Sequence, residues 1–418
     1  MWYTFYLAYT DSIFSEVFAG NEQISLSDHG VAYIASEIAK YSFLEATVDV
    51  KGTAYETIVS NTLKQEAGQF FTPRNVIKCM VEILNPTINS RVLDPACGSG
   101  GFIVMVLDHV RKQITREMYP QLSDALLEAK ANTEAVNDKV REYAENMIFG
   151  FDFDPDLKKA AKMNMVMAGD GHSNIFNINS LEYPNGTLPD KDVVTKAVAK
   201  SVEHKGDSLD CDTKYALSNA MGKFDMIFTN PPFGSKVEVA STIADNYELK
   251  AYSAPEVLFI EQCYNFLKPG GKMGIVLPDG ILGNPNTEPV RKWILQHFKL
   301  LASIDLPVET FLPQVGVQAS LLFLQKKTAL EMLQDYSTEA YDVFMAIAEK
   351  VGKDRRGNVI YERDDDGAEM LFVEKKEWAS YNRQGELIAR HRVERVKHVD
   401  DDLPKISDEY KKFVERKL

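Results

Sequence analysis

The sequence predicts an α/β fold in which a doubly wound, mostly parallel sheet carries helices on both faces. Two observations lead to this prediction. Short apolar runs that end in polar or proline-containing turns alternate with helical segments from about residue 75 to residue 325. Several of the runs, such as residues 224–229, are apolar almost throughout, which is typical of strands buried on both faces of a parallel sheet.

The composition is that of an ordinary soluble protein, and 418 residues leave room for two or three structural units. The chain has 47 Lys and Arg against 61 Asp and Glu, a formal charge of −14 that would repel a polyanion. A nucleic-acid substrate would therefore need a local basic patch or a basic partner. The four cysteines show no CxxC spacing, so neither a zinc site nor a disulfide framework is indicated and a reducing cytoplasm is expected. No apolar run is long enough to cross a bilayer, so no membrane location is expected.

Residues 1–68 show a helical pattern, with Val31, Ile34, Ala35 and Ile38 on one face. A compact turn, residues 68–74, then leads into a helix expected over residues 75–84. Thr72 is the expected N-cap of that helix, with Pro73 at its first position. A short strand follows at residues 91–93.

That strand leads into the glycine-rich segment 94–102, and then into an apolar helix. A strand, a glycine-rich turn and a helix together present backbone N–H groups to a ligand. Gly98 and Gly100 permit positive φ and close approach, while Asp94 places a carboxylate at the strand tip. The segment is not a P-loop, and Ile103 occupies the third glycine position of the dinucleotide motif. An acidic tip suits a cationic or amino-bearing ligand, such as S-adenosylmethionine, better than a pyrophosphate.

Residues 111–147 are interpreted as inserted charged helices, after which residues 147–152 form the next strand. Asp152 ends this strand, at the position where a carboxylate can accept both hydroxyl protons of a ribose. Asp154 is interpreted as the N-cap of the following helix.

A third strand is expected over residues 175–181, where Asn179 and Ser180 would approach the adenine of the cofactor. Residues 185–222 are polar and lysine-bearing, and they are interpreted as a surface insertion that could contact DNA or a partner.

The apolar run 224–229 ends in Asn230-Pro231-Pro232-Phe233. The two prolines fix φ and remove two N–H donors, which leaves bare carbonyls beside an amide and an aromatic ring. A planar amino group could donate to the side-chain oxygen of Asn230 and to the carbonyl of Pro231, while Phe233 stacks on its ring. An isolated Asn-Pro-Pro sequence is more often a turn that ends a strand, but Phe233 and the rest of the chain favour a base-binding site.

Strands and helices continue to alternate through residue 325, with an antiparallel arrangement left open for the last pair of strands, 300–306 and 319–325. One more strand is expected near residues 341–346, and turns at residues 353–358 and 364–367. The basic residues of segment 390–397 are interpreted as a solvated helix face, in preference to a DNA contact.

These motifs, in this order, resemble the N6-adenine DNA methyltransferases, specifically the modification (M) subunits of type I restriction-modification systems. The resemblance covers residues 53–326 and rests on segments 68–73, 94–102, 150–152, 230–233 and 268–271, with the strand 319–326. It implies a seven-stranded methyltransferase sheet at residues 69–330. A helical domain at residues 1–68 would precede it, and an extension at residues 331–418 would contact a partner.

The resemblance also implies the chemistry. Methyl transfer from S-adenosylmethionine to N6 of adenine would be carried out at Asn230, Pro231, Pro232 and Phe233, without a metal. The residues implied to bind the cofactor are Phe71, Thr72, Pro73, Asp94, Ala96, Gly98, Ser99, Gly100, Phe102, Asp152, Asn179 and Ser180. For Phe71 and Phe102, core packing is an equal alternative.

The expected partners are double-stranded DNA with a flipped adenine and a specificity subunit bound by two copies of the chain, while a restriction subunit is an optional further partner. Sequence-specific methylation is expected only within such a complex, because the chain is acidic and no module for reading DNA follows residue 325. Two other functions stay open: methylation of RNA or of protein glutamine, and a catalytically silent scaffold that binds the cofactor.

Overall fold

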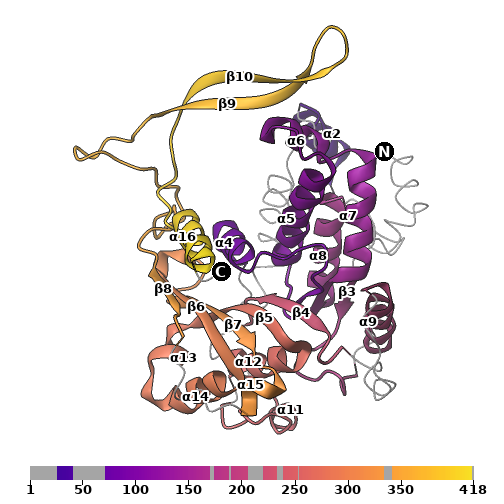
Figure 1. Cartoon of the computed structure of the whole chain (residues 1–418), viewed down its shortest axis with the longest axis vertical. Coiled ribbons are helices and arrows are strands. Elements are labelled where there is room, and N and C mark those ends of the chain that lie inside the picture. The colour runs from indigo at the N-terminus through magenta and orange to yellow at the C-terminus, as the bar shows by residue number, and fades with distance from the viewer. Residues whose placement is uncertain are drawn as a thin grey trace.

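The computed structural model describes residues 26–40, 71–169, 174–187, 190–205, 220–232, 239–252, 254–333 and 341–416. At its centre is an eight-stranded sheet with the strand order β3-β2-β1-β4-β5-β7-β6-β8 (Figure 1). Its strands are β1 (Val92–Asp94), β2 (Ile148–Asp152), β3 (Asn174–Asn177), β4 (Phe224–Thr229), β5 (Leu267–Pro278), β6 (Phe298–Leu306), β7 (Ala319–Lys326) and β8 (Phe344–Ile347).

All neighbouring strands in this sheet are parallel except those beside β7, which runs antiparallel to both β5 and β6. The predicted α/β fold is therefore confirmed, and the last pair of the predicted strands is antiparallel. The expected count of seven was wrong by one strand, because β8 extends the sheet beside β6. This is the additional strand that the sequence suggested near residues 341–346.

Helices cover both faces of the sheet. The helices are α2 (Asp28–Ile38), α4 (Arg74–Leu84), α5 (Gly101–Met118), α6 (Asp124–Lys130), α7 (Glu134–Met147), α8 (Pro155–Met167), α9 (Lys191–Lys205), α11 (Ser241–Ala244), α12 (Pro255–Phe266), α13 (Asp279–Gly283), α14 (Glu288–His297), α15 (Ala329–Leu333) and α16 (Leu403–Glu415). One buried cluster joins the sheet to α4, α5, α7, α8 and α16, and a second joins it to α9, α12 and α14. Successive residues of β4 divide between them, with Phe228 in the first cluster and Ile227 in the second. This alternation follows from the two-residue period of a strand.

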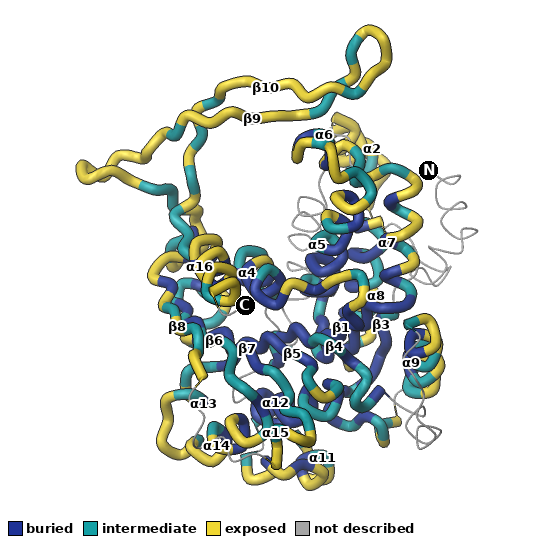
Figure 2. The backbone as a smooth tube through the Cα atoms, in the orientation of Figure 1, coloured by how far each residue is buried: buried dark blue, intermediate teal, exposed yellow. Residues whose placement is uncertain are grey.

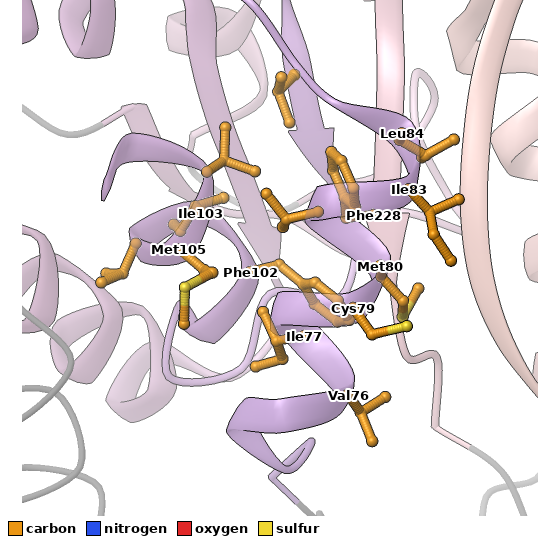
Figure 3. Packing of buried hydrophobic residues seen from close by; sticks show 14 of the residues in the cluster. Val76, Ile77, Cys79, Met80, Ile83, Leu84, Phe102, Ile103, Met105 and Phe228 are labelled. Atoms are coloured by element: carbon orange, nitrogen blue, oxygen red, sulfur yellow. The ribbon is translucent and has the colours of Figure 1, made fainter. Parts of the chain in front are cut away.

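Helix α4 buries one side against α5 and β4 (Figure 3). Its apolar residues recur three and four positions apart, as in Val76, Met80 and Ile83, so they form a single buried stripe. Phe102, in the first turn of α5, lies between α4 and the sheet, and its ring stacks on that of Phe228 at 6.2 Å between centroids. This packing fixes the start of α5 over the end of β4.

Two local predictions need correction. Helix α4 begins at Arg74 with Pro73 at the N-cap position and with no side-chain cap, so the predicted capping by Thr72 was wrong. Residues 191–205 are not a surface insertion, since α9 buries Val194, Val198 and Val202 against the sheet. By contrast, Asp154 accepts hydrogen bonds from the backbone N–H groups of residues 156 and 157, as predicted for the N-cap of α8.

The carboxyl-terminal part contains a projecting hairpin of β9 (Phe372–Tyr381) and β10 (Leu387–Val396), which pair antiparallel over ten residues (Figure 1). Most of its residues are exposed (Figure 2). The basic segment 390–397 therefore lies mainly on a strand, and its interpretation as a helix face was wrong although its exposure was foreseen. After the hairpin, α16 packs on α4 and buries Leu403, Ile406 and Tyr410.

The proposed boundaries at residues 68 and 330 remain predictions. Of residues 1–68, the structure describes only 26–40, where α2 leaves Ile34 and Ile38 exposed. In the described part of the chain, no helix combines the length and apolar character that crossing a bilayer requires.

Candidate active site

Three adjacent parallel strands, β2, β1 and β4, bring the predicted site residues to one edge of the sheet. Asp94 is the last residue of β1, Asp152 is the last residue of β2, and Asn230 directly follows β4. In an open α/β sheet the carboxyl ends of the strands are where ligands bind. The structure therefore brings together residues that lie up to 136 positions apart in the chain, counted from 94 to 230.

The glycine-rich turn folds back on the tip of β1. Gly98 and Gly100 have φ of 52° and 83°, which confirms the predicted need for glycine at these positions. The backbone N–H of Ala96 donates to the Asp94 carboxylate at 3.1 Å. A Cβ added at Gly98 would meet no atom within 4 Å, so this part of the turn faces open space.

Asp152 holds the same turn from the neighbouring strand. One carboxylate oxygen accepts from the backbone N–H of Gly98 at 2.9 Å, and the other accepts from that of Asp154 at 2.9 Å. Each oxygen keeps a second lone pair. Asp152 therefore fixes the turn and retains acceptor capacity for a diol.

Asn230 has an asymmetric environment. Its side-chain nitrogen donates to the hydroxyl of Thr72 at 3.1 Å. Its side-chain oxygen is buried and has no hydrogen-bond partner among the described residues. Pro231 is also buried, while Phe233 lies outside the described residues. The turn after β4 thus contains one buried acceptor that is available to a donor.

A cavity of about 50 Å³ lies between the glycine-rich turn, the start of α4 and Asn230. Its lining includes eight of the predicted residues: Phe71, Thr72, Asp94, Ala96, Gly98, Ser99, Phe102 and Asn230. Ile77, Cys97 and Gly101 also line it and were not predicted, although the last two lie within the glycine-rich motif. A complete nucleoside cofactor needs several times this volume, so the cavity as it stands holds only part of one.

Other predicted residues lie apart from this cavity. The Ser180 hydroxyl donates to the carbonyl of Pro95 at 2.6 Å, and Asn179 donates to Glu182 at 3.0 Å. Both residues therefore shape the loop after β3. The strand β3 itself ends at Asn177, four residues earlier than expected. Phe102, which does line the cavity, is 4% exposed and stacks on Phe228, so its packing role is observed directly. Cofactor contacts of these residues remain predictions.

Burial dominates the electrostatics of the two acidic strand tips. It raises the pKa of Asp94 from 3.8 to about 8, against the opposing effect of the Ala96 N–H. It raises the pKa of Asp152 to about 6, although the N–H groups of Asp154 and Gly98 favour the charged form. In the described part of the chain, no positive charge offsets the burial of either carboxylate.

These features fit S-adenosylmethionine. The cofactor carries a sulfonium and an ammonium group, which suit buried carboxylates, and a ribose diol, which suits the remaining lone pairs of Asp152. The N-terminal N–H groups of α5, which starts at Gly101, can bind its carboxylate.

Comparison with known proteins identifies the family of this chain. The family model of the N-6 DNA methylases matches residues 46–397. The methylase subunit of the type I restriction enzyme EcoEI from Escherichia coli is 25% identical over 278 residues, which are 66% of this chain and 46% of that protein. The corresponding EcoKI subunit from Escherichia coli (strain K12) is 25% identical over 290 residues, covering 68% of this chain and 46% of that protein.

Among solved structures, a modification subunit from Vibrio vulnificus YJ016 has a TM-score of 0.53 and 20% identity. The match covers 92% of this chain and 73% of that one, and at this identity it supports the fold alone. The chain spans about half the length of the curated relatives it matches. Because the family model covers most of the sequence, the chain belongs to the N-6 DNA methylase family.

Proposed function

We propose that this chain transfers the methyl group of S-adenosylmethionine to N6 of adenine in double-stranded DNA, as the modification subunit of a type I restriction-modification complex. The observation that carries the proposal is the buried side-chain oxygen of Asn230, which has no partner among the described residues and lies next to a cavity that Asp94 and the glycine-rich turn also line. An exocyclic amino group is the donor that completes this arrangement.

The turn after β4 would act on the amino group directly. The Asn230 oxygen would accept one N–H, the carbonyl of Pro231 the other, and Phe233 would stack on the base. Two acceptors draw the nitrogen lone pair out of conjugation with the ring, which makes N6 a better nucleophile. No strongly basic side chain is needed, because the nitrogen becomes acidic once it is methylated, and Asn230 or water can relay its proton.

The strand tips would orient the cofactor, which supplies an activated methyl group on its sulfonium. Asp94 would neutralise the cationic end, and Asp152 would hold the ribose. Binding of a cation lowers the pKa of a neighbouring carboxyl, so the raised pKa of Asp94 would fall as the site fills. The chain's own residues would thus bind and align the two reactants.

Access to the site requires the adenine to leave the duplex, at a cost of a few kcal/mol. Stacking on an aromatic ring offsets roughly 1 to 3 kcal/mol of it. The formal charge of −14 opposes DNA binding, so a partner would supply phosphate contacts and sequence reading. We assign this role to a specificity subunit bound by two copies of the chain. The relatives named as methylase subunits of type I restriction enzymes support membership of a multi-subunit complex.

Transfer of a radioactive methyl group from S-adenosylmethionine tests the proposal. The full chain, alone and co-purified with partners co-expressed from neighbouring genes, would be incubated with DNA, RNA and protein acceptors. We expect label in DNA, recovered as N6-methyladenine, and efficient sequence-specific transfer only by the complex. Label confined to RNA or protein, or present only as methylcytosine, would contradict the proposed substrate.

A matched pair of asparagine variants isolates the site. Asn230→Ala should abolish transfer while the variant still binds S-adenosylmethionine. Asn246→Ala, at an exposed position after α11, should behave as the unmodified chain. Cofactor binding without transfer to any acceptor by the complete complex would instead indicate a silent scaffold.

A further inference from the structure

Thr72 occupies a position where a helix cap is expected, but it does not act as one. It lies two residues before α4, which begins without any side-chain cap. Its hydroxyl instead accepts from the side-chain nitrogen of Asn230, 158 residues away in the sequence. Because Pro73 stands at the N-cap position, Thr72 has no cap to form, and its long-range contact with Asn230 is the interaction that needs an explanation.

In the observed orientation, the contact with Thr72 occupies the amide nitrogen of Asn230 and leaves the amide oxygen for a substrate. With its nitrogen on Thr72, the amide turns its oxygen toward a buried position that contains no partner among the described residues. If the amide rotated by half a turn, a donor would stand there and an amino group would meet another donor. Pro73 restricts Thr72 to extended backbone conformations, which limits where its hydroxyl can lie.

We propose that Thr72 is a positioning residue, which holds the Asn230 amide with its oxygen toward the base and so selects a base that presents an amino group. The proposal rests on the proposed function and adds a determinant of substrate specificity to it. Thr72 thereby acts through Asn230, whereas the family resemblance places it against the cofactor.

Two variants separate these roles. Thr72→Val keeps the shape and removes the hydroxyl, while Thr72→Ser keeps the hydroxyl. The full chain is labelled with ¹⁵N-asparagine, and the side-chain N–H₂ signal of Asn230 is assigned by its loss in Asn230→Asp. In Thr72→Val this signal should shift, and its hydrogens should exchange with solvent at least about tenfold faster, since a hydrogen bond is lost. Thr72→Ser should retain the signal of the unmodified chain. An unchanged signal in Thr72→Val would overturn the proposal.

Kinetics of the complex provide the second readout. Thr72→Val should lower kcat for adenine methylation by about tenfold or more and leave the affinity for S-adenosylmethionine unchanged. Thr72→Ser should keep the kcat of the unmodified chain. Weaker cofactor binding by Thr72→Val with an unchanged kcat would assign Thr72 to the cofactor and refute the proposal. If the unmodified complex methylates no adenine, the proposed function fails, whereas the asparagine signal still decides whether Thr72 holds Asn230.

Discussion

Replacing Asp94 by asparagine is expected to remove a large part of the pH dependence of cofactor binding between pH 6 and pH 8. Burial raises the pKa of Asp94 to about 8, so in the cofactor-free protein this carboxyl is mostly neutral at pH 7. A cationic cofactor binds the charged form. Binding at pH 7 must therefore release the proton of Asp94, and this cost disappears as the pH rises through 8.

The size of the effect follows from one linked proton. Each pH unit below the pKa weakens binding by about tenfold, so the dissociation constant should fall by about 50-fold from pH 6 to pH 8 and level off above pH 8. Asp152, whose pKa is about 6, adds to this dependence only at the lower end of the range. Asp94→Asn should bind more weakly at pH 8 and show a much flatter curve.

Titration calorimetry of both proteins at several pH values measures the effect. The ammonium group of the cofactor titrates in the same range, but it does so with both proteins, so the ratio of their dissociation constants isolates Asp94. Buffers of different ionisation enthalpy should reveal close to one more proton released by the unmodified chain at pH 7. Parallel pH curves for the two proteins would refute the reasoning.

Stability gives a readout that does not depend on the cofactor. Because the folded-state pKa of Asp94 is raised above 3.8, its contribution to stability is present below pH 4 and is lost as the pH rises toward 8. The loss is about 1.4 kcal/mol per pH unit for one proton. Relative to the unmodified chain, Asp94→Asn should therefore gain on the order of 2 kcal/mol between pH 5.5 and pH 7.5 in urea unfolding.

Three further outcomes are expected. Asp152→Asn should weaken cofactor binding at least about tenfold in calorimetry. Asp154→Ala should leave cofactor binding unchanged and lower the free energy of unfolding by about 1 kcal/mol, because the N-cap of α8 is lost. Gly100→Ala should cost roughly 1 to 2 kcal/mol in urea unfolding, because the φ of 83° is unfavourable for a residue with a Cβ. Phe228→Ala, which empties a fully buried site, should cost about 3 to 5 kcal/mol, visible as a lower Tm.

The residues of the candidate site whose placement in the fold followed from the sequence are those encoded locally. Asp94 and Asp152 each end an apolar run, and the residues that follow contain the glycines or the helix cap that mark a strand end. Parallel strands place such ends at one edge of the sheet without further information. The Asn230 turn is likewise defined by its own two prolines.

The errors have different physical causes. Thr72 was expected to cap α4, and nothing near it in the sequence reveals a partner 158 residues away. The hairpin of β9 and β10 is exposed on both faces, so it lacks the alternation that normally identifies a strand. In α9 the pattern of Val194, Val198 and Val202 was present, but lysines between these residues concealed it.

Several local features of the site are unfavourable for the chain on its own, and all of them lie near one cavity. Asp94 and Asp152 are buried carboxyls with raised pKa values, and Asn230 has a buried oxygen without a partner among the described residues. At the same edge, α4 starts without a side-chain cap. Isolated defects of this kind occur in many folds, but their convergence needs a common cause. A cation would stabilise the carboxylates and an N–H donor would satisfy the amide oxygen, so a cationic methyl donor and an amino-bearing base together account for the arrangement.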